Sequence, residues 1–227
     1  MATMEGQVAL VTGGARGIGL AISTRLADRG IRVAVGYSHG ADTAKAFAAA
    51  HEGSTIHQGN IGIAADCQRV IAEVLDQHGQ LDILVNNAGI TIDRTVRKMS
   101  VEDWDRVIHV NLSGAFYLSR AVLQHMLDNG YGRIINLGSQ AGSVALPTES
   151  VYCMTKAAIS HLTKCLAVEW GQYNITVNAV APTFINTPGT AEALGDPAFR
   201  EDVLSRIALG RIGEPEEVAA AAVFLAS

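Results

Sequence analysis

The sequence is poor in charged residues. Asp, Glu, Lys and Arg make up 17% of its 227 residues, below the roughly 25% of an average globular protein. Hydrophobic residues make up 48%, so a chain of this length can bury a large continuous core. This composition excludes disorder as the main state, because disordered chains combine high charge with few apolar residues.

Basic segments and long apolar runs are also missing. The chain has 17 Lys and Arg against 22 Asp and Glu, a formal charge of −5, and the basic residues gather in no segment. The charge distribution therefore gives no electrostatic basis for sequence-independent binding of nucleic acid. The longest apolar run, Val218–Ala226, is far shorter than the roughly 20 residues of a membrane span. We expect neither a nucleic-acid partner nor membrane insertion.

Cysteine is scarce, and histidine forms no metal-binding pattern. Cys67, Cys153 and Cys165 are odd in number and lack the C-x-x-C spacing, a usage typical of reduced thiols in the cytoplasm. The seven histidines occur in neither an H-E-x-x-H motif nor a cluster with cysteine. We therefore expect a cytoplasmic protein without a dedicated metal site.

Short apolar runs alternate with helical patterns along the whole chain. Runs such as Val8–Val11 and Ile134–Leu137 predict buried strands. Between such runs, apolar residues recur at helical spacing, as Ile18 and Ile22 do. The alternation predicts an α/β fold with a doubly wound, Rossmann-type parallel sheet, in a single domain over residues 1–227.

Some segments carry more specific expectations. One long helix should begin near Ser100 and continue to Asn129, and another should span Ser150–Trp170. Pro215 suits the first turn of the last helix. Thr187–Leu209 contains two prolines and two glycines among small and apolar residues, so we expect it to be the least regular stretch.

In an open parallel sheet, ligands bind beyond the carboxyl ends of the strands. The segment Thr12–Gly19 follows the first predicted strand and has the pattern G-x-x-x-G-x-G from Gly13 onward. These glycines allow a tight turn and let backbone N–H groups approach a pyrophosphate at a helix N-terminus. No Gly-Lys-Ser/Thr follows, which excludes a nucleotide-hydrolysing P-loop. A glycine-rich turn without a ligand is the alternative.

Polar residues follow two further strands and continue onto a helix. Asn86-Asn87-Ala88-Gly89 follows the fourth predicted strand and Ser139 the fifth. Tyr152 and Lys156 have i,i+4 spacing, which places both on one helix face. An ammonium beside a phenol favours the phenolate, so we expect Lys156 to lower the pKa of Tyr152. Taken singly, each motif has an ordinary alternative, namely a turn or a solvated helix face.

Together these motifs resemble the short-chain dehydrogenase/reductase family. They occur in the family's order and are Thr12-Gly13-x-x-x-Gly17-Ile18-Gly19, Asn86-Asn87-Ala88-Gly89, Asn111, Ser139 and Tyr152-x-x-x-Lys156. The resemblance covers the chain from Val8 onward and implies NAD(P)(H) as hydride carrier. The family normally adds a further strand, with a Thr-Gly and Asp-Gly-Gly signature, beyond the position of Ser227.

The resemblance implies four catalytic residues. Tyr152 is the implied general acid/base, and Lys156 lowers its pKa and holds the ribose. Ser139 positions the substrate carbonyl, and Asn111 keeps a water that links Lys156 to solvent. The predicted cofactor-binding residues are Gly13, Arg16, Gly17, Ile18, Gly19, Tyr37, Ser38, Asn60, Ile61, Asn87, Ala88, Gly89, Tyr152, Lys156 and Pro182.

The middle of the chain is similar to 3-oxoacyl-thioester reductases of the acetoacetyl-CoA and acyl-carrier-protein types. Gly59-Asn60-Ile61 is similar to the acetoacetyl-CoA branch, whereas most of the family carries Asp at Asn60 to hold the adenine. Two segments depart from that branch. The loop Gln140–Val151 is not glutamine-rich, and Pro182-Thr183 replaces the usual Pro-Gly, as in several polyol and sugar dehydrogenases of the family.

Three functions stay open on the sequence. The first is reduction of a 3-oxoacyl thioester, and the second is oxidation of a sugar, polyol or other secondary alcohol with the same machinery. The third is a dinucleotide-binding redox sensor without catalysis. A sensor is expected to lose part of the set Ser139, Tyr152 and Lys156, and all three are present. By resemblance we also expect a homotetramer, formed through Trp104–Met126 and the helix of Tyr152.

The residues after the second strand favour NADP(H). An NAD-specific site usually places Asp or Glu about 20 residues past the glycine motif, but no carboxylate follows that strand before Asp42. Arg16 carries a guanidinium suited to a 2′-phosphate, and Tyr37 and Ser38 add hydroxyl donors. We predict NADPH over NADH, with NAD(H) as the alternative if Asp42 reaches back to the ribose.

Overall fold

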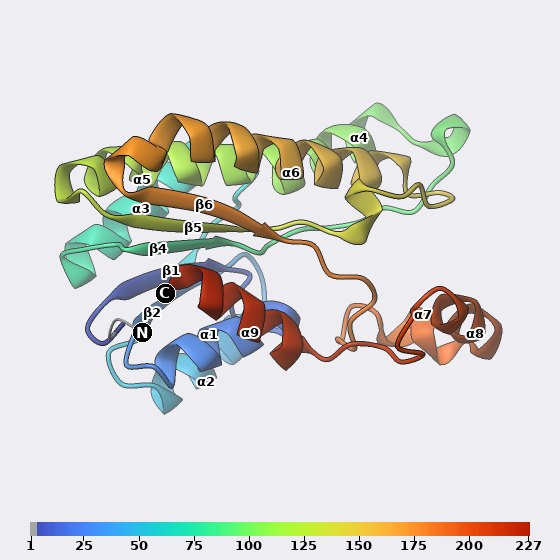
Figure 1. The fold of residues 1–227 in the computed structure, drawn as a ribbon, viewed down its shortest axis with the longest axis horizontal. Helices are drawn as coiled ribbons and strands as arrows, with labels where there is room; N and C mark the ends of the chain where they lie inside the picture. Colours follow the sequence, from blue (N-terminus) through green and yellow to red (C-terminus); the bar gives the residue numbers. More distant parts are fainter. Residues whose placement is uncertain (1–3) are drawn as a thin grey trace.

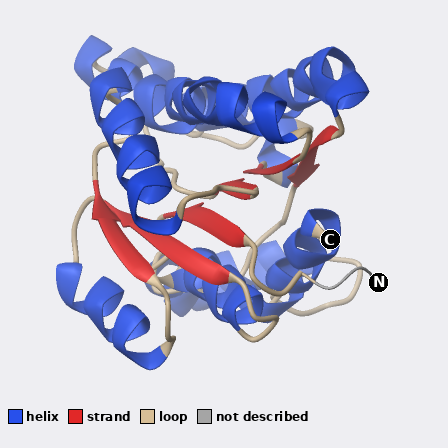
Figure 2. Ribbon diagram, turned by 90° about the vertical axis from the view of Figure 1, so that its left-hand side faces the viewer, coloured by secondary structure: helices blue, strands red, loops and turns tan. Residues whose placement is uncertain are grey.

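The computed structural model describes residues 4–227. Six parallel strands form one sheet in the order β3-β2-β1-β4-β5-β6, and helices cover both of its faces (Figures 1 and 2). The strands are β1 (Val8–Thr12), β2 (Arg32–Tyr37), β3 (Thr55–Gln58), β4 (Ile83–Asn86), β5 (Gly132–Leu137) and β6 (Ile175–Val180). The predicted α/β, doubly wound, Rossmann-type sheet is confirmed.

Nine α-helices connect or follow the strands within the described residues. They are α1 (Gly17–Ala27), α2 (Ala41–Ala50), α3 (Ala64–His78), α4 (Val101–Ile108), α5 (Gly114–Asn129), α6 (Ser150–Trp170), α7 (Ala191–Gly195), α8 (Pro197–Ser205) and α9 (Pro215–Ala226). The helix α9 starts as predicted, with Pro215 in its first turn and a capping box between Glu214 and Glu217.

The core consists of one apolar layer on each face of the sheet. All five residues of β1 are buried, because successive side chains point to opposite, helix-covered faces. Ala9 and Val11 belong to the layer that includes α1 and α9, whereas Val8 and Leu10 pack in the layer of α3, α5 and α6. The continuous apolar runs of the sequence therefore correspond to strands buried on both faces.

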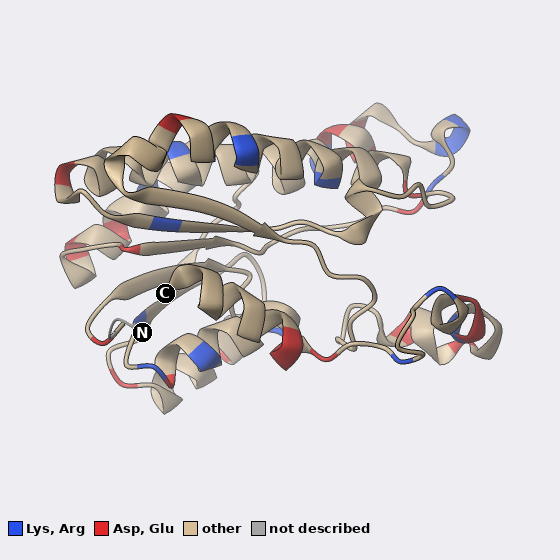
Figure 3. Cartoon of the chain, in the orientation of Figure 1, with Lys and Arg blue, Asp and Glu red and all other residues tan. Residues whose placement is uncertain are grey.

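Charged residues lie mainly on the helices and loops, and most of the sheet carries none (Figure 3). This distribution accounts for the low charged fraction, because the doubly covered strands use a large share of the chain. Within residues 4–227, no helix combines the length and the apolar character that a membrane crossing requires.

The segment predicted as one helix from Ser100 to Asn129 is interrupted. It begins as expected, since the Ser100 side chain accepts a hydrogen bond from the Asp103 N–H at 3.1 Å. A π-helical turn, His109–Ser113, then separates α4 from α5. Such a turn widens the helix and is often found at functional sites. Here it contains Asn111, which is buried.

The segment Thr187–Leu209 is more regular than predicted. It contains α7 and α8, which lie beyond the end of the sheet in Figure 1 and share a small core of Leu194, Val203 and Ile212. Asp196 accepts a hydrogen bond from Phe199 N–H at 2.8 Å, so Asp-Pro starts α8 rather than breaking the chain.

Candidate active site

The glycine loop between β1 and α1 has the conformation that its sequence requires. Gly13 and Gly17 have φ of 62° and 52°, the left-handed region that side chains disfavour. A side chain at Gly19 would collide with the carbonyl oxygen of Gly13. Arg16 is exposed and occupies the N-cap of α1. The loop therefore presents the free N–H groups of a helix N-terminus, which suit a phosphate.

Hydrogen bonds lock this loop to the segment after β4. The Thr12 hydroxyl accepts from the N–H groups of Asn87 and Ala88, each at 3.0 Å, and donates to the Val85 carbonyl. In return, Asn87 Nδ2 donates to the Thr12 carbonyl at 2.8 Å. The strand order reverses between β1 and β4, and such a switch point is where this fold binds its ligand.

A buried chain of side-chain hydrogen bonds lies behind this edge. Asn86 Nδ2 donates to Asn136 Oδ1 at 2.9 Å and to Ser119 Oγ at 3.3 Å. Asn136 Nδ2 donates in turn to Thr163 Oγ1 at 2.9 Å. The chain ties β4 and β5 to α5 and α6, so it orients the helix that carries Tyr152. Sequence reasoning gave Asn136 and Thr163 no role, although an Asn within the apolar run of β5 was a signal.

Asn111 holds the chain beyond Gly89. Its Oδ1 accepts from the Ile90 N–H, and its Nδ2 donates to the Ile90 carbonyl, both at 2.8 Å. Nδ2 also lies 3.3 Å from Thr155 Oγ1 on α6. One carboxamide thus satisfies both backbone groups of Ile90 and links that segment to the helix of Tyr152 and Lys156. The water that the resemblance assigns to Asn111 stays a prediction.

Ser139, Tyr152 and Lys156 come together beyond β5. Lys156 is 5% exposed, and its Nζ donates to the Leu137 carbonyl at 2.6 Å. Nζ also lies 5.6 Å from the centre of the Tyr152 ring. Ser139 follows β5 directly, and its Oγ accepts from the Ala141 N–H at 3.1 Å. The i,i+4 spacing therefore places the Lys156 ammonium beside the tyrosine ring, in a position with little access to solvent.

The expected lowering of the pKa of Tyr152 is wrong for this structure. Burial raises that pKa, and Glu149 raises it further, whereas a hydrogen bond with Ser139 opposes the shift. The phenol is protonated at neutral pH, as it would be without the shift. Burial also lowers the pKa of Lys156 to about 8, because an ammonium without water is disfavoured.

The remaining predicted cofactor residues lie at the same edge of the sheet, because the strands are parallel. Tyr37 ends β2 and exposed Ser38 follows it, while Asn60 and Ile61 follow β3. Pro182 follows β6, and its carbonyl accepts from the Gln140 N–H at 2.9 Å. Among residues 4–227, no group of His, Cys, Asp and Glu is arranged to hold a metal ion.

These features define a class of protein. A parallel sheet whose order reverses beside a glycine loop, with Ser, Tyr and Lys beyond the neighbouring strands, is the arrangement of a dinucleotide-binding enzyme. The described edge also fits such a cofactor chemically. It offers backbone N–H groups for phosphates at the glycine loop and hydroxyl groups at Tyr37 and Ser38.

Comparisons with known proteins identify the family. A family model described as Enoyl-(Acyl carrier protein) reductase matches residues 13–227. A 3-oxoacyl-[acyl-carrier-protein] reductase of Synechocystis sp. is 42% identical over all of this chain and 92% of its own length. An acetoacetyl-CoA reductase of Shinella zoogloeoides is 40% identical over 97% of this chain and 91% of its own. A D-threitol dehydrogenase of Mycolicibacterium smegmatis is 41% identical, with coverages of 99% and 87%.

A solved structure agrees with these relatives. The crystal structure of gox2181 superposes with a TM-score of 0.94 at 32% identity, and it covers 98% of this chain and 89% of its own. The chain belongs to the short-chain dehydrogenase/reductase family and is an NAD(P)-dependent oxidoreductase.

The buried ammonium of Lys156 makes stability depend on pH. Its pKa is about 8 in the folded chain against an ordinary 10.5, so the unfolded state binds more protons between these values. The free energy of unfolding should therefore rise with pH above about 8, by a total on the order of 3 kcal/mol for a shift of this size. Urea denaturation of the wild type and of Lys156→Met across this range measures the effect.

The comparison with Lys156→Met removes the contributions of other titrating groups. Burial raises the pKa of Cys67 to about 11, which makes stability fall at high pH in both proteins alike. The difference between the two proteins then isolates Lys156. A pH dependence that is the same in both would contradict the assignment of a buried, charged Lys156.

Proposed function

We propose that this chain reduces the carbonyl group of a 3-oxoacyl thioester to a secondary alcohol, with NADPH as the preferred hydride donor. The observation that carries the substrate class is a cavity of about 250 Å³ between the segment after Ser139 and α8. Its apolar lining residues are Val144, Ala145, Leu146, Phe184, Val203 and Ile207. An acyl chain suits such walls, and two of the relatives are named as reductases of 3-oxoacyl or acetoacetyl thioesters.

The proposed mechanism assigns each polar side chain a task. When bound, the nicotinamide supplies the hydride. The Ser139 hydroxyl donates a hydrogen bond to the substrate carbonyl oxygen and stabilises the charge that develops there. Tyr152 then transfers its phenolic proton to that oxygen. The phenol is protonated at neutral pH, as it would be with the ordinary tyrosine pKa, and a proton donor must be protonated for reduction. Lys156 holds the ribose beside Tyr152, and Asn111 supports the segment that faces them.

Tyr152→Phe tests the proton transfer. The change removes the hydroxyl and keeps the ring, so turnover should fall by the roughly 10²–10⁴-fold typical of general acid–base catalysis. Cofactor affinity should persist, because the glycine loop holds the phosphates. Steady-state kinetics with NADPH titration measures both quantities. Turnover close to that of the wild type would overturn the assignment of Tyr152.

A dehydrogenase of a polyol, sugar or other secondary alcohol is the second candidate. Gln140, Thr183 and Arg206 give the same cavity polar groups, which suit hydroxylated substrates, and one relative is named D-threitol dehydrogenase. The chain should turn over acetoacetyl-CoA with NADPH at a higher kcat/KM than any of a panel of polyols and sugars. A polyol with the higher value would replace the thioester as substrate. Absence of turnover with every substrate would favour the redox sensor.

Arg16→Ala tests the cofactor preference. Arg16 is exposed at the N-cap of α1, and no carboxylate ends β2, so we propose that its guanidinium contacts the 2′-phosphate. The change should lower kcat/KM for NADPH by about tenfold, the effect of losing roughly 1.4 kcal/mol, and leave the value for NADH nearly unchanged. A wild type that prefers NADH, or equal losses with both cofactors, would contradict the role of Arg16.

We also propose a cytoplasmic homotetramer. The three cysteines are free, which suits a reducing compartment. Large apolar side chains are exposed on the helices that the resemblance assigns to subunit contacts, among them Trp104 on α4, Phe116 on α5 and Val168 on α6. Burial of these side chains against a second subunit would remove apolar surface from water. Light scattering at micromolar concentration should give four times the mass of the chain, and a monomer would overturn the proposal.

A further inference from the structure

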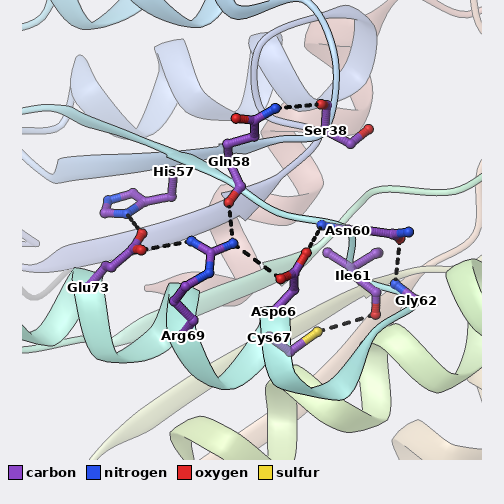
Figure 4. Close-up of polar contacts among 10 residues, drawn as sticks. All are labelled: Ser38, His57, Gln58, Asn60, Ile61, Gly62, Asp66, Cys67, Arg69 and Glu73. Atoms are coloured by element: carbon purple, nitrogen blue, oxygen red, sulfur yellow. Dashed lines mark hydrogen bonds and ion pairs between the residues drawn. The ribbon is translucent and has the colours of Figure 1, made fainter.

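Arg69 on α3 is the centre of a hydrogen-bonded network that the catalytic proposal does not use. Its Nη1 donates to Glu73 Oε1 at 2.7 Å, and its Nη2 donates to the Gln58 carbonyl at 2.8 Å (Figure 4). Nη2 also lies 3.4 Å from Asp66 Oδ1. One guanidinium thus joins the last residue of β3 to two carboxylates of the following helix.

Through Asp66, the network determines the course of the loop after β3. Asp66 Oδ2 accepts from the Asn60 N–H at 2.8 Å, and Asn60 Oδ1 accepts from the Gly62 N–H at 3.0 Å. The hydrogen bond from Asn60 and the neighbouring Arg69 lower the pKa of Asp66, so this carboxyl group is ionised at neutral pH. Asn60 and Ile61 are both predicted to bind the cofactor. The ion pair of Asp66 and Arg69 therefore supports this segment through the backbone N–H of Asn60.

Through Gln58, the same network reaches the end of β2. Gln58 Nε2 donates to the Ser38 carbonyl at 3.3 Å, while the Gln58 carbonyl accepts from Arg69 (Figure 4). Behind Arg69, Glu73 is oriented by the buried His57, whose Nδ1 lies 3.3 Å from Glu73 Oε2. The segments at Ser38 and at Asn60, both expected at one end of the cofactor, are thus connected to the same arginine, through Gln58 and through Asp66.

The topology indicates which end of the cofactor this is. A dinucleotide lies across the switch point between β1 and β4, with one nucleotide over each half of the sheet. Ser139 and Tyr152 lie on the half that contains β4, β5 and β6, so the reacting nicotinamide belongs there. The adenosine half then lies over β1, β2 and β3, beside Ser38 and Asn60. We propose that Arg69 is a positioning residue for the adenosine half of the cofactor, acting through Asp66 and Gln58.

This role differs from a contribution to stability. Arg69, Asp66 and Glu73 are 46%, 32% and 37% exposed in their side chains, and exposed ion pairs stabilise proteins little. A network that orients two loops instead lowers the entropy lost when the cofactor binds. Breaking it should therefore weaken cofactor binding while the thermal unfolding temperature stays nearly unchanged.

Arg69→Met and Asp66→Ala test the proposal, with Arg25→Met as the matched control. Arg25 is an exposed arginine of α1, and its guanidinium has no hydrogen bond or ion pair among residues 4–227. The Kd of NADPH, measured by fluorescence titration, should rise about tenfold in each test variant and stay unchanged in the control. Turnover at saturating NADPH should be that of the wild type. With reduced nicotinamide mononucleotide, which lacks the adenosine half, kcat/KM should also be unchanged.

The double variant Arg69→Met/Asp66→Ala provides a second readout. Because both changes break the same connection to Asn60, their effects on log Kd should be clearly less than additive. An unchanged Kd in both single variants, or equal losses with NADPH and the mononucleotide, would overturn the proposal. The fluorescence titration needs no substrate, so failure of the proposed thioester activity would leave this result interpretable.

Discussion

The hydrogen bonds between Thr12 and Asn87 are the constraint on which the site depends. They join the ends of β1 and β4 at the one place where the strand order reverses. On one side of this junction, Gly19 must lack a side chain because the loop is held so closely. On the other side, Asn111 continues the connection from Ile90 to α6. The hydrogen bonds between Thr12 and Asn87 therefore fix the positions of the two halves of a dinucleotide site relative to each other.

Polar groups inside this low-charge protein are concentrated where the chemistry is proposed. Lys156 is a buried cation that is hydrogen-bonded to a backbone carbonyl rather than to a carboxylate. The ring centre of Tyr152 lies 5.6 Å from Lys156 Nζ, the residue is half-buried, and its phenol is protonated at neutral pH. Burial thus costs folding energy at Lys156, and at Tyr152 it disfavours the phenolate. Behind the site, the Asn86–Asn136–Thr163 chain connects β4 and β5 to α6.

The parts of the fold that sequence reasoning predicted correctly are those set by local signals. Apolar runs such as Val8–Val11 marked strands, and Pro215 marked the start of α9, because burial and capping act on neighbouring residues. The π-helical turn at Asn111 was missed, since the apolar spacing continues through it and the partner of Asn111, Ile90, lies 21 residues away in the sequence. The helix α8 was missed because Asp196-Pro197 serves equally as a cap and as a turn.

By itself, the sequence determined the fold class, the family and the order of the motifs, because periodicity and motif spacing are written along the chain. It also identified the i,i+4 pair of Tyr152 and Lys156. Only the tertiary structure decided the sign of the pKa shift at Tyr152, since desolvation depends on what covers the ring. Likewise, only the structure showed that Arg69 is connected to Ser38 through Gln58 and to Asn60 through Asp66. These residues lie on different strands, loops and helices, and only the packing of these elements brings them together.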